Sequence, residues 1–132
     1  MRIVLDTNIF VSGIHWTGSS EKILRIWMEG KFELVSSLPI IEEIVRVLAN
    51  FKVPLDAEDI LWWESLILEK SILVIPTEEV KIVKNDPDDN KFIEAALEAK
   101  ADFIVSQDKH LLVIKEYQRI KIVHPEEFLK LL

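Results

Sequence analysis

Cysteine is absent from the 132 residues of this chain. Without a thiol, the chain can form neither a disulfide scaffold nor a thiolate metal site, and this composition fits a reducing compartment. Long apolar runs are also missing, because none approaches the roughly 18 residues that a membrane span requires. The N-terminus has neither a basic flank nor a small-residue cleavage site. We therefore expect a soluble, cytoplasmic protein that makes no membrane contact.

Positive charge is scarce as well. The 16 Lys and Arg residues are outnumbered by 23 Asp and Glu residues, which gives a net charge of −7. A nucleic-acid-binding protein usually carries a basic face that displaces phosphate counterions, so this balance argues at first against one. The same balance suits a protein whose carboxylates converge on a divalent cation, because a bound cation inverts the local electrostatics. The positions of the acids decide between these two interpretations.

Composition and the order of apolar runs predict one globular domain over residues 1–132. Hydrophobic residues make up 49% of the chain and charged residues 30%, which is typical of a folded domain. Short β-branched runs predict strands over residues 2–5, 32–36, 71–75, 102–106 and 120–123. Longer amphipathic segments predict helices over residues 19–30, 37–51, 56–70, 88–100, 109–117 and 125–132. Strands that alternate with helices favour parallel pairing, so we expect a three-layer α/β/α sandwich with a small parallel sheet.

Two aspartates follow predicted strands at the point where each strand ends. Asp6 comes directly after the run 2–5, and Asp108 follows the run 102–106. In a parallel sheet covered by helices, ligands bind beyond the carboxyl ends of the strands. Asp102 stands at the start of its strand, so it belongs to the opposite edge and is excluded. A single aspartate after a strand is most often a turn residue or a helix cap, but two at equivalent strand ends favour a site.

Further acids lie before and within predicted helices. In "NDPDDNK" (85–91), Asp-Pro predicts a turn and Asp88 can cap the following helix, which leaves Asp89 in the first turn. Adjacent acids repel each other, so a site that gathers cations explains Asp89 economically. In the second predicted helix, Glu42 and Glu43 flank the apolar stripe on opposite sides. The helical wheel hardly distinguishes these two residues, and a solvated helix face would explain either.

Three segments, taken in order, carry a resemblance to a known family. They are "VLDTNIFVSGIHWTGSS" (4–20), "SSLPIIEEIVRVL" (36–48) and "DPDDNKFIEAALEAKADFIVSQDKHLL" (86–112). Together they resemble the PIN-domain family, and they are most similar to the single-domain prokaryotic branch that includes the VapC-type toxins. The resemblance extends over essentially the whole chain. It implies a metal-dependent ribonuclease, a hydrolase with a PIN-like fold and a cluster of four acids.

The resemblance assigns particular positions of this chain to the site. The catalytic and metal-binding acids that it implies are Asp6, Glu43, Asp89 and Asp108. Small polar residues that commonly support such a cluster match at Thr7, Asn8 and Ser106. Gln107 departs from the pattern, because relatives often carry a small residue there. The resemblance favours Glu43 over Glu42, a choice that the helical wheel left open.

The implied chemistry is the hydrolysis of RNA phosphodiester bonds with Mg²⁺ or Mn²⁺, since hard cations prefer carboxylate oxygens. One ion would bind through Asp6 and Asp108, with Asp89 as a direct or water-mediated ligand, and would polarise an attacking water. A second ion, shared by Glu43 and the substrate phosphate, would stabilise the leaving oxygen. The basic residues expected to contact RNA phosphates are Arg46, Lys91, Lys109 and His110.

The resemblance also implies partners. Family members often dimerise, so we expect a homodimer or a higher homo-oligomer, and a toxin role would require an antitoxin protein. The helix predicted over 56–70 is unusually apolar and contains Trp62 and Trp63. We expect this helix to be buried against the body of the domain, with part of its surface available to a second copy.

Two other functions compete with that of a ribonuclease. A phosphatase of the haloacid-dehalogenase type would use a strand-end aspartate as its nucleophile, but it needs a second acid two residues later, where this chain has Asn8. A catalytically silent PIN-like binding module would keep the acids for structural reasons alone. A zinc site is not indicated, because His15, His110 and His124 show no ligand spacing. Metal-dependent cleavage of single-stranded RNA would separate the ribonuclease from both alternatives.

Overall fold

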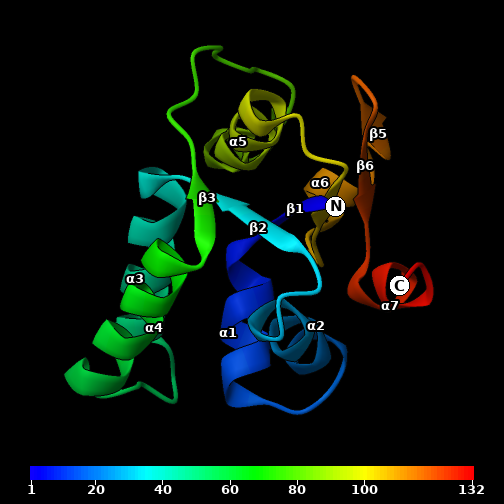
Figure 1. Ribbon diagram of the computed structural model, residues 1–132. Coiled ribbons are helices and arrows are strands. Elements are labelled where there is room, and N and C mark those ends of the chain that lie inside the picture. Colours follow the sequence, from blue (N-terminus) through cyan, green and yellow to red (C-terminus); the bar gives the residue numbers. More distant parts are fainter.

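A six-stranded sheet with the strand order β3-β2-β1-β4-β6-β5 lies at the centre of the molecule (Figure 1). The computed structural model describes residues 1–132. Its strands are β1 (Arg2–Leu5), β2 (Glu33–Ser36), β3 (Ser71–Leu73), β4 (Phe103–Val105), β5 (Glu116–Tyr117) and β6 (Ile120–Val123). All neighbouring strands are parallel except β5 and β6, which form an antiparallel pair at one edge. The predicted α/β fold with a small parallel sheet is confirmed, and the structure adds one antiparallel strand, β5, at its edge.

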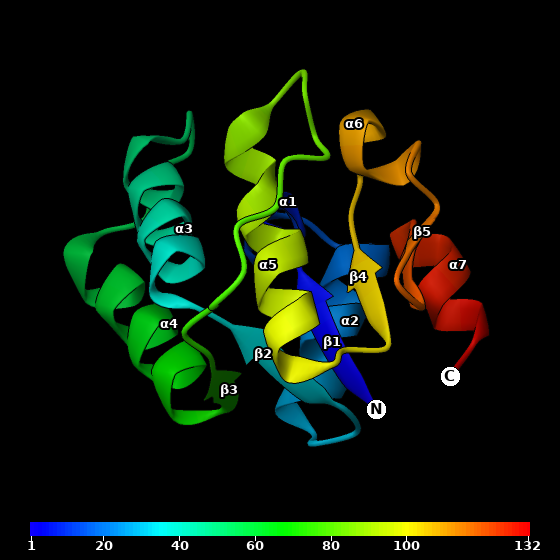
Figure 2. The ribbon, with the colours of Figure 1, turned by 90° about the horizontal axis from the view of Figure 1, so that it is seen from above.

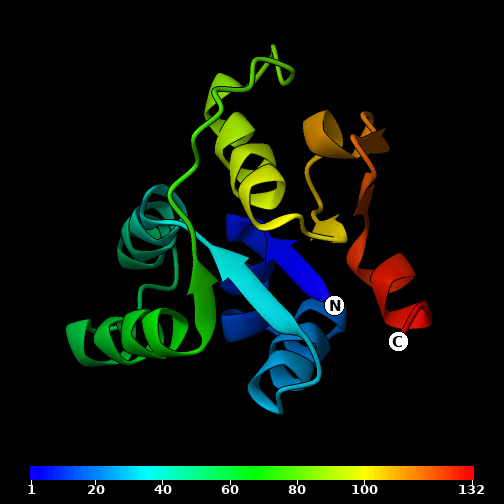
Figure 3. The ribbon, with the colours of Figure 1, turned by 45° about the horizontal axis from the view of Figure 1, so that its top comes forward.

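Helices cover both faces of this sheet. In chain order they are α1 (Thr7–His15), α2 (Ser19–Met28), α3 (Leu38–Asn50), α4 (Ala57–Glu69), the 3-10 turn η1 (Pro87–Asp89), α5 (Asn90–Ala99), α6 (Lys109–Leu112) and α7 (Pro125–Lys130). Helix α5 lies across β1, β2 and β4 on one face, whereas α1 and α2 lie on the opposite face (Figure 3). Helices α3 and α4 lie together beside the β3 edge (Figure 2). None of these helices combines the length and the apolar character needed to cross a bilayer.

Burial on both faces explains the sequence of the central strands. Ile3, Val4 and Leu5 of β1 are all buried, so this strand is a continuous apolar run and does not alternate between polar and apolar residues. On the face that carries α2, the Phe128 ring of α7 packs edge-on against Phe32. The central strands are therefore enclosed, and only their ends can present polar side chains to solvent.

Helix α1 and strand β5 were not predicted from the sequence. Helix α1 begins directly after β1 with no connecting loop, so its apolar residues continued the pattern of the strand. The helix predicted over 109–117 is wrong beyond Leu112, because the chain turns into the β5-β6 hairpin. Gln118 and Arg119 form this turn with φ angles of +46° and +73°. Such a turn is usually signalled by Asn-Gly, and a Gln-Arg pair carries no comparable signal.

Helix α4 is less buried than its sequence suggested. Ile67 is the only residue of α4 that is fully buried. Trp62 is 57% exposed and packs edge-on against the half-buried Trp63, and Leu61 is exposed as well. The expectation that this helix is buried against the body of the domain is therefore wrong for Leu61 and Trp62. Exposed aromatic residues of this kind are favoured in protein interfaces.

Gly13 sets the closest approach between α1 and α2. A Cβ atom at this position would lie 2.6 Å from Leu24 Cδ1 and 2.9 Å from the carbonyl oxygen of Ser20. The second contact involves the backbone of α2, which cannot rotate away as a flexible side chain can. Glycine is therefore required here for packing and not for its freedom of φ.

Gly13→Ala should destabilise the protein, against the usual trend for helices. Helix propensity alone would raise the free energy of unfolding by about 1 kcal/mol, whereas overpacking typically costs about 1–3 kcal/mol. Because backbone must move, we expect overpacking to prevail, with a net loss of about 1 kcal/mol. Urea unfolding followed by circular dichroism measures this change. A gain in stability would contradict the close approach of the two helices.

Candidate metal centre

The strand order reverses at the centre of the sheet. From β1 the chain proceeds to β2 and β3 on one side, and it then crosses to β4 on the other side of β1. Such a reversal opens a crevice beyond the carboxyl ends of the two central strands. Leu5 and Val105, the last residues of β1 and β4, are register partners, and the Asp6 N–H donates to Val105 O at 3.1 Å. The residues that follow both strands are therefore delivered to one place.

A pocket of about 160 Å³ lies beyond these strand ends. It is lined by Asp6, Thr7, Asn8, Glu43, Val47, Asp86, Asp89, Phe92 and Asp108. The four acids assigned by the resemblance all line it, and they come from four segments: the starts of α1, α5 and α6, and the second turn of α3. Glu42 is exposed and does not line the pocket, so α3 turns Glu43 toward the other acids.

Asp6 is both a helix cap and a member of the acid cluster. Its Oδ1 atom accepts a hydrogen bond from the Ile9 N–H at 3.1 Å, which caps α1, and its Oδ2 atom accepts one from the Ser106 hydroxyl. Burial raises the pKa of Asp6 to about 6; these two hydrogen bonds oppose the shift, and the charges of Asp108 and Glu43 add to it. The capping role that a lone strand-end aspartate suggests is thus present, and the same carboxylate lines the pocket.

Asp86, Asp89 and Asp108 bring one carboxylate oxygen each to within 4.8 Å of one another. Asp108 caps α6 by accepting a hydrogen bond from the His110 N–H at 2.8 Å. The buried Oδ2 atom of Asp89 has no hydrogen-bond partner. Burial, reinforced by Asp108, raises the pKa of Asp89 to about 8, whereas the interaction with Asp89 lowers the pKa of Asp108. Oxygen atoms that are close together, and in part unpartnered, suit a divalent cation.

Asp86 is the pocket residue that sequence reasoning missed. The Asp-Pro pair predicted a turn, and this turn gave Asp86 a sufficient structural explanation. Its backbone (φ −143°, ψ 80°) lies outside the helical region, which proline disfavours for the residue before it, and its side chain lines the pocket. The sequence did contain one indication, because three acids fall within the four residues 86–89 and a turn alone does not require so many.

Asp88 does not cap α5, contrary to prediction. The N-cap position belongs to Asp89, whose side chain makes no capping bond, and Asp88 is exposed. The turn before α5 is held instead by the buried Asn90. Its Oδ1 atom accepts a hydrogen bond from the Val83 N–H at 2.9 Å, and its Nδ2 atom donates to Pro87 O at 2.9 Å. Asn90 therefore anchors the segment that carries the acids on both sides of the proline.

The basic residues predicted to contact RNA lie around the pocket and not in it. Lys91 Nζ donates to Glu43 Oε1 at 2.7 Å and to Asp88 Oδ2 at 2.6 Å. The other carboxylate oxygen of Glu43 accepts a hydrogen bond from the Thr7 hydroxyl. Of the predicted supporting residues, Ser106 is buried beneath the acids and Asn8 is exposed at the pocket rim. The remaining basic residues, none of which lines the pocket, are Arg46, Lys109 and His110.

The residues that the sequence argument left out of the site lie elsewhere. Asp102 accepts a hydrogen bond from the Arg2 N–H at 2.8 Å, at the opposite edge of the sheet. His15 contacts two backbone carbonyl groups, and His124 caps α7. The group of side chains able to hold a metal consists of aspartates alone. The candidate centre is therefore an all-oxygen site.

The order of the acids and their place in the fold agree with a family profile. The profile of the PIN domain matches residues 2–110, a range that contains all four assigned acids. This chain belongs to the PIN domain family. The uncharacterized protein MJ1680 of Methanocaldococcus jannaschii is 32% identical to this PIN domain, over 98% of the chain and 90% of its own length.

Solved structures of PIN-like proteins share the fold. VapBC2 from Rickettsia felis, bound to a DNA fragment from its promoter, has a TM-score of 0.59 and 13% identity, with 94% of this chain and 98% of that chain covered. VapBC-1 from nontypeable Haemophilus influenzae has a TM-score of 0.56 and 18% identity, with 96% of this chain and 99% of that chain covered. FitAcB from Neisseria gonorrhoeae has a TM-score of 0.55 and 11% identity, with 94% of this chain and 98% of that chain covered. The resemblance to the PIN-domain family is confirmed by the profile, and the VapBC and FitAcB structures share the fold.

The raised pKa values of Asp6 and Asp89 predict that the metal-free protein loses stability as the pH rises. Both groups have an ordinary pKa of 3.8, so above this value the folded state holds protons that the unfolded chain has released. The resulting stabilisation of the folded state is fully present below pH 3.8. It is lost as the pH rises through about 6 for Asp6 and about 8 for Asp89. In EDTA, we expect a melting temperature roughly 4 °C or more lower at about pH 8.5 than at about pH 5.5.

The matched variant is Asp89→Asn, which removes the carboxyl group that titrates at the higher pH. Its melting temperature in EDTA should be nearly constant between about pH 7 and pH 8.5, where that of the wild type still falls. Saturating Mg²⁺ should raise the melting temperature most at high pH, because binding requires deprotonated carboxylates. A wild-type melting temperature that rises with pH in EDTA would contradict the burial of these acids.

Proposed function

We propose that this PIN domain is a divalent-metal-dependent endoribonuclease that uses Mg²⁺ or Mn²⁺ and acts as the toxin of a toxin–antitoxin pair. The observation that carries the proposal is the convergence of four acids from four separate segments on one pocket, at the point where the strand order reverses. Structural caps alone do not explain it, because Asp89 makes no capping bond and its buried oxygen has no partner. A PIN domain fold is typical of metal-dependent nucleases.

The carboxylates of this chain fit a hard divalent cation. The three oxygens grouped within 4.8 Å belong to Asp86, Asp89 and Asp108, and they are proposed as the direct ligands. This ligand set differs from the sequence expectation, in which Asp6 was a principal ligand and Asp86 was absent. Asp6 accepts one hydrogen bond on each oxygen, which leaves a further lone pair on each for a cation or for a water that the cation holds.

The chemistry in this proposal is hydrolysis by direct attack of water. When bound, Mg²⁺ or Mn²⁺ supplies Lewis-acid activation of water and neutralisation of phosphate charge. The chain supplies orientation: the Ile9 N–H and the Ser106 hydroxyl fix the Asp6 carboxylate. Thr7 carries the only hydroxyl group that lines the pocket, and it donates to Glu43. No side chain is therefore assigned as a covalent nucleophile.

Partners belong to the same proposal. VapBC complexes are among the solved structures that share this fold, which supports an antitoxin protein as a partner. The exposed apolar face of α4, with Leu61, Trp62 and Leu68, supports a homodimer. Phosphate contacts at the rim of the pocket are proposed for Arg46, Lys109 and His110.

The neighbouring glutamates of α3 provide a matched pair of variants. Glu43→Gln removes a charge from the pocket and should lower kcat by roughly a hundredfold, the scale typical of losing one electrostatic stabiliser. Glu42→Gln changes an exposed residue outside the pocket and should alter kcat by less than about threefold. The assay is turnover of one unstructured RNA at saturating Mn²⁺, with both variants checked for folding.

Four results bear directly on this proposal. Equal small effects at both glutamates would mean that Glu43 has no part in catalysis, and a larger effect at Glu42 would contradict the orientation of α3. Binding of Mn²⁺ without RNA cleavage by the wild type would contradict the enzymatic function and support a catalytically silent binding module. Cleavage that persists in EDTA would show that the reaction does not require a divalent metal.

A further inference from the structure

Lys91 places an ammonium group beside the acid pocket. Its side chain is only 11% exposed, although lysine is usually a surface residue, and its Nζ atom donates to Glu43 Oε1 at 2.7 Å. The side chain of Glu43 is 16% exposed, and its second oxygen accepts a hydrogen bond from Thr7. Both oxygens of Glu43 are therefore engaged, one of them by a cation that belongs to the chain.

This arrangement divides the acids of the pocket into two groups. The oxygens of Asp86, Asp89 and Asp108 lie together with no basic side chain paired to them. Glu43 already has its counter-ion. A second divalent cation at Glu43 would have to displace the Lys91 ammonium or bind beside it, and like charges at such distances repel strongly where solvent is limited.

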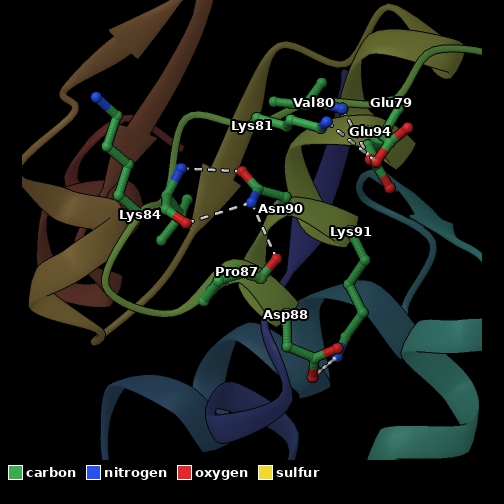
Figure 4. A pocket seen from close by; sticks show the side chains of 10 residues that line it. Glu79, Val80, Lys81, Lys84, Pro87, Asp88, Asn90, Lys91 and Glu94 are labelled. Atoms are coloured by element: carbon green, nitrogen blue, oxygen red, sulfur yellow. Dashed lines mark hydrogen bonds and ion pairs between the residues drawn. The ribbon is translucent and has the colours of Figure 1, made fainter.

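The second partner of Lys91 is easily exchanged. Asp88, which accepts a hydrogen bond from Nζ at 2.6 Å, has a side chain that is 68% exposed. Both residues line an open groove of about 480 Å³ between residues 79–88 and α5, where Lys91 extends to meet Asp88 (Figure 4). An ammonium group has three N–H donors, and two of them are used here. A phosphate oxygen can accept from the third donor, or it can replace the exposed Asp88 while Glu43 stays in place.

We propose that this site takes a single divalent cation and that the Lys91 ammonium, held by Glu43, stands where a second metal ion would otherwise bind the substrate phosphate. The inference rests on the proposed nuclease function and deepens it. Lys91 supplies a fixed positive charge to the phosphate, and Glu43 positions that charge instead of binding metal. This differs from the sequence expectation, in which Glu43 shared a second ion with the substrate.

The test is the number of Mn²⁺ ions bound by the full-length protein, measured by isothermal calorimetry and by electron paramagnetic resonance of free Mn²⁺. We expect one ion per wild-type chain. Lys91→Met removes the charge while keeping a side chain of similar shape, so Glu43 becomes available, and a second ion should bind with a dissociation constant of about 1 mM or below. Lys91→Arg keeps the charge and should bind one ion. Lys84→Met, which changes another lysine of the same groove, should also bind one.

Each outcome has a defined meaning. Two ions on the wild-type chain would overturn the proposed role of Lys91 but not the proposed nuclease function. This measurement does not depend on whether any variant folds. A single ion on a folded Lys91→Met chain would overturn that role too. No Mn²⁺ on the wild type at millimolar concentration would instead overturn the proposed nuclease function. If the inference holds, Lys91→Met should also lower kcat by roughly a hundredfold with one ion bound, while Lys91→Arg retains most activity.

Discussion

Carboxylates held close together repel each other, and the centre of this PIN domain gathers five of them: Asp6, Glu43, Asp86, Asp89 and Asp108. The surrounding structure offsets part of this repulsion with neutral donors and one ammonium group. The Ile9 and His110 N–H groups, the Ser106 and Thr7 hydroxyls and Lys91 all donate to these acids. The buried Oδ2 atom of Asp89 has no such donor, and Asp89 lies in the group of three aspartates formed with Asp86 and Asp108. The chain thus supplies donors to Asp6, Glu43 and Asp108 and leaves the buried oxygen of Asp89 for an external cation.

Two of the acids owe their orientation to the same bonds that begin helices. Asp6 caps α1, which begins directly after β1, and Asp108 caps α6, which begins at Lys109, shortly after β4 ends at Val105. A capping carboxylate has a fixed direction, because its oxygen must meet N–H groups of the first helical turn. Structural and functional explanations of these residues are therefore not alternatives. The cap aims the carboxylate, and the paired strands bring the two caps together.

All strands except β5, the layer order and the meeting of Asp6 with Asp108 were predictable from the sequence, because parallel strands of buried residues end at one edge. Glu43 was not decided by the helical wheel, since its orientation depends on how α3 rests against α1 and α5. Asp86 was missed because a turn already explained it, and α1 was missed because no polar loop separates it from β1. The ion pair of Lys91 joins α5 to α3 across 48 positions of the sequence, and no local pattern encodes such a contact.

The central claim is that the oxygens of Asp86, Asp89 and Asp108 bind one divalent cation. Anomalous diffraction from crystals of the wild-type protein soaked in millimolar Mn²⁺ tests it directly, because Mn²⁺ scatters anomalously far more strongly than the carbon, nitrogen and oxygen atoms of the chain. The account predicts one anomalous peak at the carboxyl ends of β1 and β4, about 2.0–2.6 Å from these three carboxylates. A soaked crystal with no peak in this pocket, or with Mn²⁺ bound only at other acids, would contradict it.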